Sequence, residues 1–431
     1  MADTGHKSRA AAGWLLHRIL DRGQMLDTAL AEAQEKGGRM AGLAPRDRAF
    51  ARLMVVTVLR RLGQIDDAIG RCLDKPLNKA AKPARNALRL AAAQTMFLGT
   101  PGHAVADGAV RLMGPRQRHL SGLVNAVARR LIREAPEIIK DQNEIELNCP
   151  AWLRQGWSDT YGGEATEKMI AQMLSEPSLD LTLKGDGGDW AGKLDAEILS
   201  TGSLRRQSGG AIQALPGFEE GAWWVQDAAA ALPIRLLGGV ANRAVLDLCA
   251  APGGKTAQLA ALGARVTAID NGQKRLALLR ANLDRLNLQA ETIVADMITW
   301  RPSEPFEFIL LDAPCSATGT IRRHPDIWHL RTADEIQQAA EVQDQLLLAA
   351  VEMLAPGGTL VFCTCSLQPE EGDQRIESLL SSGAPVRRAP ITANELFGLD
   401  KVITEDGDMR TLPHYQGGMD GFYASRLVKT A

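Results

Sequence analysis

Two cysteines in separate motifs are the residues of this chain best suited to covalent chemistry. Cys315 lies in the segment DAPCSATG (312–319) and Cys365 in FCTCS (362–366), and both follow a glycine-rich turn, DLCAAPGGKT (247–256). A thiolate can add to carbon 6 of a pyrimidine, which activates carbon 5, and can leave again afterwards. A turn able to hold a cofactor, combined with two such thiols, predicts methyl transfer to a pyrimidine carbon.

Length and composition indicate a soluble protein of two or three domains. The chain has 431 residues, more than one hydrophobic core usually serves, and 45% of them are hydrophobic. The first residues, MADTGHKSRAAAG, contain no apolar signal segment, and no stretch approaches the roughly 18 uninterrupted apolar residues of a membrane helix. We therefore expect a cytoplasmic protein, acting as a monomer without a membrane partner.

The six cysteines are scattered along the chain and indicate neither a disulfide framework nor a zinc site. They stand at positions 72, 149, 249, 315, 363 and 365, and none forms a CxxC pair with a second ligand pair. We expect no bound metal.

Charge is distributed unevenly between the two ends of the chain. Residues 1–130 contain 22 Lys and Arg against 10 Asp and Glu, whereas the remaining residues contain 27 against 41. A basic block attached to an acidic body is typical of a module that binds a polyanion such as RNA. A solvated helical surface without a partner explains the charge equally well.

Sequence periodicity predicts three domains. Helical spacing of apolar residues, interrupted by Gly and Pro, predicts an all-α domain of five to seven helices over residues 1–140. Tryptophans spread among Gly and Pro over residues 150–235 predict a small α+β connector, in which they serve as core anchors or stack on bases. Residues 236–431 alternate between strand and helix and form the third domain.

The alternation in the third domain predicts a doubly wound, largely parallel sheet of the Rossmann-like class. Ligands of such sheets bind outside the carboxyl ends of the strands. Asp270, Asp296, Asp312 and Cys365 all come at strand ends. The expected strands are 245–248, 265–270, 291–296, 306–312 and 359–364, with helices at 274–286 and 334–354.

The glycine-rich turn matches neither of the common phosphate-binding motifs. Gly254-Lys255-Thr256 resembles the end of a P-loop, but Cys249 stands where that loop requires its first glycine. The dinucleotide pattern GxGxxG is also missing, which disfavours a nicotinamide-dependent dehydrogenase. Asp270 could accept both ribose hydroxyl hydrogens of an adenosine and Asp296 could accept from its amino group, or both could cap the helices that follow.

Longer blocks around these residues resemble one family. DLCAAPGGKT, DAPCSATGTIRRHPDIWHLR and FCTCSLQPEEGDQ are similar to the signature blocks of the Fmu/Sun family of RNA cytosine-C5 methyltransferases. RDRAFARLMVVTVLRR, LRLAAAQTMFLGTPGHAVADGAV and GLVNAVARR resemble the NusB-like RNA-binding domain of its ribosomal, RsmB-type branch. The resemblance extends over nearly the whole chain and implies small-subunit (16S) ribosomal RNA as the substrate.

The resemblance also implies a role for each matched residue. Cys365 would be the nucleophile, Cys315 would assist release of the product, and Asp312 would hydrogen bond the base at N3. S-adenosyl-L-methionine would be the cofactor. The residues that would bind it are Cys249, Ala250, Ala251, Pro252, Gly253, Gly254, Lys255, Asp270, Asp296 and Asp312.

A basic loop after the fourth expected strand is a candidate for holding the RNA. It contains Arg322, Arg323 and His324, which could contact a phosphate or the base. Two departures from the family pattern are visible: Ala317 stands where relatives commonly have Gly, and LTLKG (181–185) replaces an Arg-Val-Asn strand. Cys363 matches no role and is expected to serve packing.

Two alternatives stay open. A transfer RNA substrate would use the same chemistry, although the N-terminal domain argues against it. A NusB-like RNA-binding factor with an inactive catalytic half would need no nucleophile, and the intact Asp312, Cys315 and Cys365 argue against that.

Overall fold

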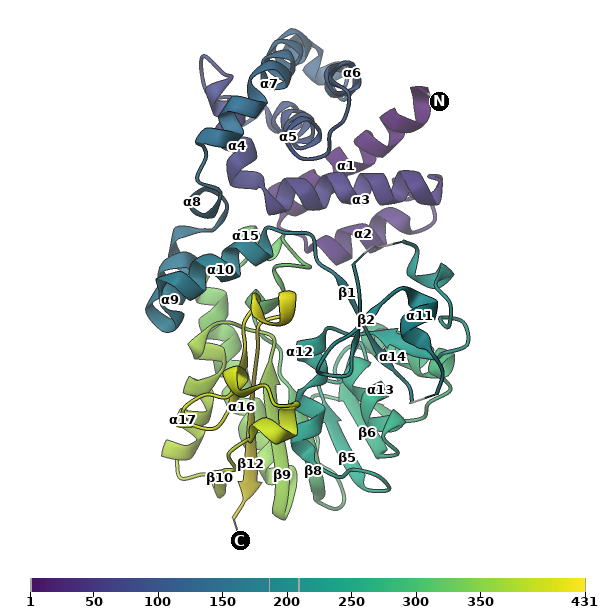
Figure 1. The fold of residues 1–431 in the computed structure, drawn as a ribbon, viewed down its shortest axis with the longest axis vertical. Helices are drawn as coiled ribbons and strands as arrows, with labels where there is room; N and C mark the ends of the chain where they lie inside the picture. Colours follow the sequence, from purple (N-terminus) through teal and green to yellow (C-terminus); the bar gives the residue numbers. More distant parts are fainter. Residues whose placement is uncertain (1, 186, 208–209, 431) are drawn as a thin grey trace. The chain divides into compact units, whose positions relative to one another are not determined.

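The contacts of the chain divide it into two compact units. The structure, a computed structural model, describes residues 2–185, 187–207 and 210–430 (Figure 1). The first unit comprises Met1–Leu174 together with Arg323–Arg331, and the second comprises Ser175–Arg322 and Thr332–Ala431.

The first unit is built from helices, as the sequence predicts (Figure 1). Its described elements are α1 (Ala2–Arg22), α2 (Leu26–Gln34), α3 (Pro45–Arg60), α4 (Leu62–Arg71), α5 (Lys82–Met96), α6 (Gly102–Arg111), η1 (Pro115–Leu120), α7 (Ser121–Asp141), α8 (Glu144–Asn148), α9 (Ala151–Tyr161), α10 (Gly163–Met173) and α15 (Ile327–Leu330). Apolar residues at helical spacing, such as Leu15, Leu16 and Ile19 on α1, are fully buried in its core.

Residues 150–235, expected to form one connector, are shared between the two units. α9 and α10 belong to the first unit, where the buried Trp157 packs edge-on against Trp328 with ring centroids 6.3 Å apart. The rest of the segment belongs to the second unit. α9 and α10 are assigned to the first unit because α9 packs against residues distant in the sequence, such as Trp328. The local composition of Gly, Pro and Trp does not indicate this division.

The second unit begins with a small antiparallel sheet. Its strands are β1 (Leu179–Leu183), β2 (Glu197–Ile198), β3 (Leu204–Arg206) and β4 (Trp223–Val225), in the spatial order β2-β3-β1-β4. Leu181, Leu204 and Trp223 are buried in its core. The segment also contains α11 (Trp190–Leu194) and η2 (Ile212–Ala214).

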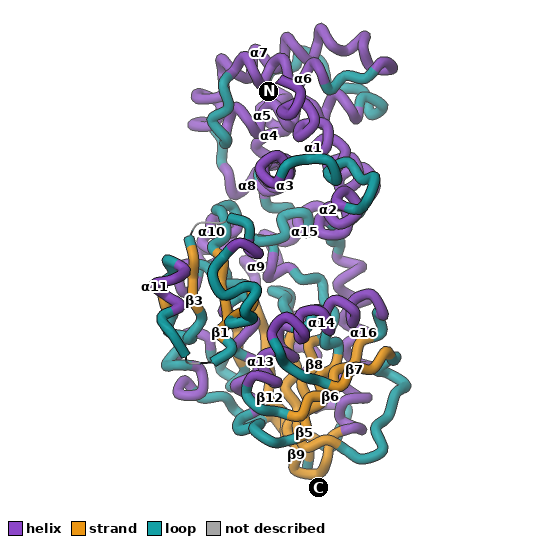
Figure 2. Tube along the Cα trace, turned by 90° about the vertical axis from the view of Figure 1, so that its right-hand side faces the viewer, coloured by secondary structure: helices purple, strands orange, loops and turns teal. Residues whose placement is uncertain are grey.

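A mixed eight-stranded sheet forms the centre of the second unit (Figure 2). Its order is β10-β12-β9-β8-β5-β6-β7, with β11 paired to β12. The strands β5 to β9 pair in parallel, and β10, β11 and β12 add antiparallel pairs. The strands are β5 (Ala244–Leu248), β6 (Arg265–Asp270), β7 (Glu291–Val294), β8 (Phe306–Asp312), β9 (Leu354–Thr364), β10 (Val386–Arg388), β11 (Met409–Thr411) and β12 (Phe422–Lys429).

Helices cover both faces of this sheet, as expected for the Rossmann-like class (Figure 2). Val245 and Leu310 pack with α13 and α14, whereas their neighbours Leu246 and Leu311 pack with α16 and α17. Burial on both faces explains the continuous apolar runs of these strands. The helices are α12 (Ala228–Ala231), η3 (Pro233–Leu237), α13 (Gly254–Ala261), α14 (Gln273–Leu286), η4 (Thr318–Thr320), α16 (Ala333–Met353), η5 (Pro369–Glu371), α17 (Asp373–Ser381), η6 (Ala393–Leu396), η7 (Asp400–Val402) and η8 (Tyr415–Gly417).

None of the helices in the described part of the chain is both long enough and apolar enough to cross a membrane.

Candidate active site

Four parallel strands bring the predicted site residues to one edge of the central sheet. β5 ends at Leu248, β6 at Asp270, β8 at Asp312 and β9 at Thr364. The carboxyl ends of parallel strands meet at the same edge, where doubly wound sheets bind their ligands. The turn after β5 and both candidate thiols therefore lie at this edge.

The turn after β5 has a backbone that few side chains tolerate. Cys249 has φ 61° and Gly253 has φ 100°, both in the left-handed region, and the Ala251–Pro252 peptide is cis. A Cβ on Gly253 would lie 2.7 Å from Cγ of Leu279 on α14, so only glycine fits there. Cys249 thus contributes a left-handed backbone conformation to the turn.

Asp270 ties the turn to the neighbouring strand. Its buried carboxylate accepts hydrogen bonds from the Ala251 amide at 3.3 Å and the Gly272 amide at 2.8 Å, and pairs with Arg275 at 2.7 Å. Asp296 lies two residues beyond the end of β7, is exposed, and accepts from the Ile298 amide at 2.9 Å. Contact of either carboxylate with an adenosine stays a prediction.

A buried ion pair lies between the turn and the end of β8. Lys255 Nζ donates to Asp312 Oδ2 at 2.8 Å and lies 4.7 Å from the centroid of the Phe422 ring. Burial opposes the charge of Lys255, but the charge of Asp312, its hydrogen bond and the nearby thiols of Cys363 and Cys365 outweigh burial, so the pKa of Lys255 is raised. A permanent cation therefore stands within electrostatic reach of Cys365.

The two candidate thiols are neighbours. Cys315 Sγ and Cys365 Sγ are 3.5 Å apart, and both side chains are half-buried. The hydrogen bond with Cys365, burial and the negative charges of Cys365 and Glu371 together raise the pKa of Cys315 well above its ordinary value. Cys315 is therefore held as a thiol beside Cys365.

The buried Asp247 adds a further carboxyl group to this edge of the sheet. Thr256 donates to its Oδ2 at 2.6 Å, and its Oδ1 is buried without a hydrogen-bond partner among the described residues. Asp247, Asp270 and Asp312 outnumber the two cations paired with them, Lys255 and Arg275, and an excess of carboxyl groups favours a ligand carrying a sulfonium and an ammonium group. These residues fit S-adenosyl-L-methionine.

Comparison with known proteins identifies the family. Residues 234–428 match the family model described as 16S rRNA methyltransferase RsmB/F, and residues 6–133 match the NusB family. Ribosomal RNA small subunit methyltransferase B from Vibrio vulnificus is 36% identical over 98% of this chain and 99% of its own length. The chain belongs to the RsmB/F family. The protein of the same name from Shewanella oneidensis is 34% identical over 98% of this chain and 99% of its own.

Solved structures show the same fold. The crystal structure of PH0851 superposes on the RsmB/F-family chain with a TM-score of 0.76, at 22% identity over 98% of this chain and 99% of the other. NSun6 from Pyrococcus horikoshii gives a TM-score of 0.53, at 19% identity over 65% of this chain and 98% of its own. Family membership supports the predictions of an RNA methyltransferase and of S-adenosyl-L-methionine as its cofactor.

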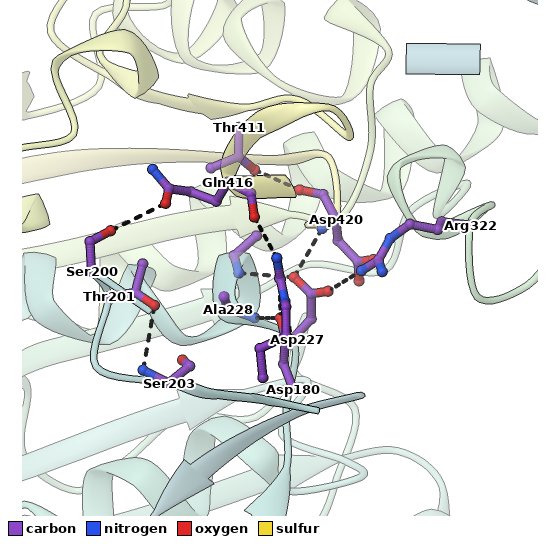
Figure 3. Close-up of polar contacts among 12 residues, drawn as sticks. Asp180, Ser200, Thr201, Ser203, Asp227, Ala228, Arg322, Thr411, Gln416 and Asp420 are labelled. Atoms are coloured by element: carbon purple, nitrogen blue, oxygen red, sulfur yellow. Dashed lines mark hydrogen bonds and ion pairs between the residues drawn. The ribbon is translucent and has the colours of Figure 1, made fainter. Parts of the chain in front are cut away.

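Arg322, a candidate for RNA contact, is buried in this RsmB/F-family structure (Figure 3). Only 1% of it is exposed, and its guanidinium donates to Asp227 Oδ2 at 2.7 Å and lies 3.6 Å from Asp420 Oδ1. Asp227 also accepts from the amides of Ala229 and Asp420, both at 2.9 Å. The ion pair thus joins three distant segments, which favours a structural role for Arg322 over an RNA contact.

A second buried ion pair lies beside the first (Figure 3). Arg205 on β3 donates twice to Asp180 on β1, each time at 2.7 Å, and also donates to the carbonyl of Gln416. Asp180 in turn accepts from the Ala228 amide at 3.2 Å. Sequence reasoning missed Asp180, Arg205 and Asp227, because only distant partners distinguish them from surface charges.

We expect Arg322→Met to destabilise the second unit by about 3–5 kcal/mol, because Asp227 and Asp420 would remain buried without their cation. Arg323→Met, at the next position, removes a charge that is less buried and should cost about 1 kcal/mol or less. Urea denaturation of both variants measures the difference. Loss of RNA affinity in Arg322→Met without loss of stability would instead support the prediction that Arg322 contacts RNA.

Arg323 and His324 lie in the segment Arg323–Arg331, which belongs to the first unit. His324 lies 3.4 Å from Asp27, and Arg323 lies 3.3 Å from the His324 ring. Asp326 accepts from the Leu26 amide at the start of α2 at 2.8 Å, and His329 donates to the Leu59 carbonyl at 2.7 Å. Contact of Arg323 and His324 with RNA stays a prediction.

Asp247 makes the stability of this RsmB/F-family chain depend on pH. Burial raises its pKa from 3.8 to about 7, so the folded state resists its ionisation while the unfolded state does not. The contribution of the protonated Asp247 to the free energy of unfolding is therefore complete below pH 4 and is lost as the pH rises through about 7. We expect the difference in unfolding free energy between Asp247→Asn and wild type to shift by about 2 kcal/mol in favour of the variant when the pH rises from 5 to 8. Urea denaturation at both pH values measures this, and an equal difference at the two would contradict it.

The described residues contain no group of three His, Cys, Asp or Glu side chains placed to bind a metal ion.

Proposed function

We propose that this chain methylates carbon 5 of a cytosine in small-subunit ribosomal RNA through a covalent adduct of Cys365. The observation that carries the proposal is the pair of thiols 3.5 Å apart, at the sheet edge where Asp312 ends β8 and where doubly wound folds bind ligands. One thiol can attack carbon 6 of the base, and the other can assist the later release of the product. The names of the relatives support the choice of RNA.

Cys365 is the nucleophile in this proposal. Its thiolate adds to carbon 6, a carbon–sulfur bond forms, and the electron pair of the 5,6 double bond moves to carbon 5. The Lys255 cation lies within electrostatic reach of Cys365 and can stabilise negative charge during this addition. When N3 of the base takes up a proton from solvent, the Asp312 carboxylate accepts a hydrogen bond from it, and the positive charge on the ring draws electron density away from carbon 6 and aids the attack.

The turn Cys249–Lys255, with Asp270, Asp296 and Asp312, holds S-adenosyl-L-methionine in this proposal. The cofactor supplies an electrophilic methyl group on a sulfonium. The cis peptide and the left-handed residues of the turn orient its backbone, and Asp270 keeps the turn against β6.

Product release needs loss of the carbon 5 proton and cleavage of the carbon–sulfur bond, which returns the electron pair to the ring. Cys315 lies against Cys365 and is held as a thiol by its surroundings. We propose that it assists this step by donating a hydrogen bond to the departing thiolate of Cys365, while hydroxide from solvent takes the carbon 5 proton and becomes water.

The helical first unit serves as the RNA-binding domain in this proposal. Its sequence contains the basic block of residues 1–130, and residues 6–133 match the NusB family. Lys and Arg neutralise phosphates and release counterions, so RNA affinity should fall steeply with salt. The protein would work in the cytoplasm as a monomer.

Methyl transfer tests the proposal directly. The full-length protein is incubated with labelled S-adenosyl-L-methionine and with 16S ribosomal RNA, unmethylated transfer RNA or both in competition, and the label is mapped to a base. 5-Methylcytosine in the ribosomal RNA supports the proposal, whereas preference for transfer RNA overturns the substrate. If no RNA is methylated while RNA still binds, the chain is an inactive RNA-binding factor.

A further inference from the structure

Glu371 is a fully buried carboxylate that the reaction outlined above leaves without a role. It ends η5, six residues after Cys365, and none of its surface is exposed. An ionised side chain is costly to bury unless hydrogen bonds compensate it. Its partners therefore indicate what it does.

The two serines that directly follow the thiols in the sequence donate to the Glu371 carboxylate. The Ser316 amide donates to Oε1 at 2.6 Å, and the Ser316 hydroxyl donates to Oε2. The Ser366 hydroxyl donates to the same Oε2 at 2.5 Å. One carboxylate thus holds both Cys315-Ser316 and Cys365-Ser366.

Further hydrogen bonds join the two loops around this carboxylate. The hydroxyls of Ser316 and Ser366 are 3.3 Å apart, and the Gly319 amide donates to the Cys365 carbonyl at 3.0 Å. The Leu367 amide donates to Thr318 Oγ1 at 3.0 Å. Charge-assisted hydrogen bonds are about twice as strong as neutral ones, so Glu371 provides the strongest connection in this set.

We propose that Glu371 is a positioning residue that holds the two thiols at their reactive separation. The inference rests on the proposed function, because it assigns a task to the geometry of Cys315 and Cys365. The Glu371 charge is also one cause of the raised pKa of Cys315, which keeps that thiol protonated. Glu371 contacts neither reactant in this role and acts through the serines beside the thiols.

Glu371→Gln is the decisive variant, because it preserves size while removing the charge and one acceptor. We expect kcat to fall about 10- to 100-fold, since small displacements of reacting groups have effects of this size. KM for RNA and the affinity for S-adenosyl-L-methionine should stay within about twofold of wild type. The hydrogen bonds of Glu371 with Ser316 and Ser366 hold the loops of the two thiols, and neither serine is among the residues proposed to bind RNA or the cofactor. A kcat within twofold of wild type would overturn the proposal.

Glu377→Gln is the matched control. Glu377 is exposed on α17, where it pairs with Arg388, so the same change of charge should leave kcat at the wild-type value. If Glu371→Gln does not fold by circular dichroism, Ser366→Ala replaces it. That variant removes one donor to Glu371 and leaves the carboxylate in place, and it should also lower kcat without changing KM.

A thiol assay decides the proposal without RNA. Iodoacetamide labels the folded proteins between pH 7 and pH 10, and mass spectrometry follows Cys315. In Glu371→Gln we expect the pH profile to shift to lower pH and labelling at pH 8 to rise about threefold or more, whereas Glu377→Gln should match wild type. An unchanged profile overturns the proposal. If wild type methylates no cytosine, the proposed function fails, and this profile still tests whether Glu371 controls the thiol pair.

Discussion

Cys365→Ala should abolish methyl transfer. Without the thiolate no adduct forms at carbon 6, so carbon 5 stays unreactive, and we expect the rate to fall on the order of 10⁴-fold or more. RNA binding and cofactor affinity should stay close to wild type, because alanine removes a single sulfur from a half-buried position. Transfer of labelled methyl groups to 16S ribosomal RNA measures the loss.

Cys72→Ala is the control for this experiment. Cys72 is a buried cysteine in the helical core of the first unit, whereas both thiols belong to the second unit. Its removal should leave the rate unchanged. Methylation by Cys365→Ala at a rate near that of wild type would show that another group is the nucleophile, and Cys315, whose sulfur lies 3.5 Å from that of Cys365, would be the next candidate.

Cys315→Ala should form the covalent adduct and fail to resolve it. Cys365 remains able to attack, but the thiol 3.5 Å away that we propose to assist release is gone. General acid–base assistance contributes about 10²- to 10⁴-fold, and turnover should fall by that amount. Denaturing electrophoresis with labelled RNA should show protein that stays attached to the RNA.

The double variant Cys315→Ala/Cys365→Ala separates a true adduct from tight binding. It should show no attached protein, since its nucleophile is missing. Free product from Cys315→Ala at the wild-type rate would contradict the role in release and leave the nucleophile assignment intact.

The strands of the central sheet could be predicted because each is a short apolar run with a recognisable end. The expected strand 265–270 coincides with β6, the strand 306–312 coincides with β8, and the helix 274–286 begins one residue earlier, as α14. Burial on both faces requires such runs, and an aspartate follows where the strand reaches the crevice. The glycine-rich turn and both thiols then fall at one edge from topology alone.

Tertiary pairing altered the other strands. β9 begins at Leu354, five residues before the expected start, because Leu354 pairs with Phe306 across a β-bulge. β7 ends at Val294, two residues before Asp296, which turns to accept from a nearby amide. Ala317, noted as a departure from the family pattern, adopts φ 60°, a left-handed conformation that explains why glycine suits this position.

Local patterns in the sequence determined the class of the fold and predicted the cofactor turn and the two candidate thiols, because periodicity, turn residues and motif spacing are properties of neighbouring residues. The tertiary structure alone decided which charges are buried. Arg322 reads as a basic loop residue, yet it pairs with Asp227, 95 residues away, and Glu371 meets Ser316, 55 residues away. Such pairs form only when the whole chain folds, since burial and distant partners leave no local trace in the sequence.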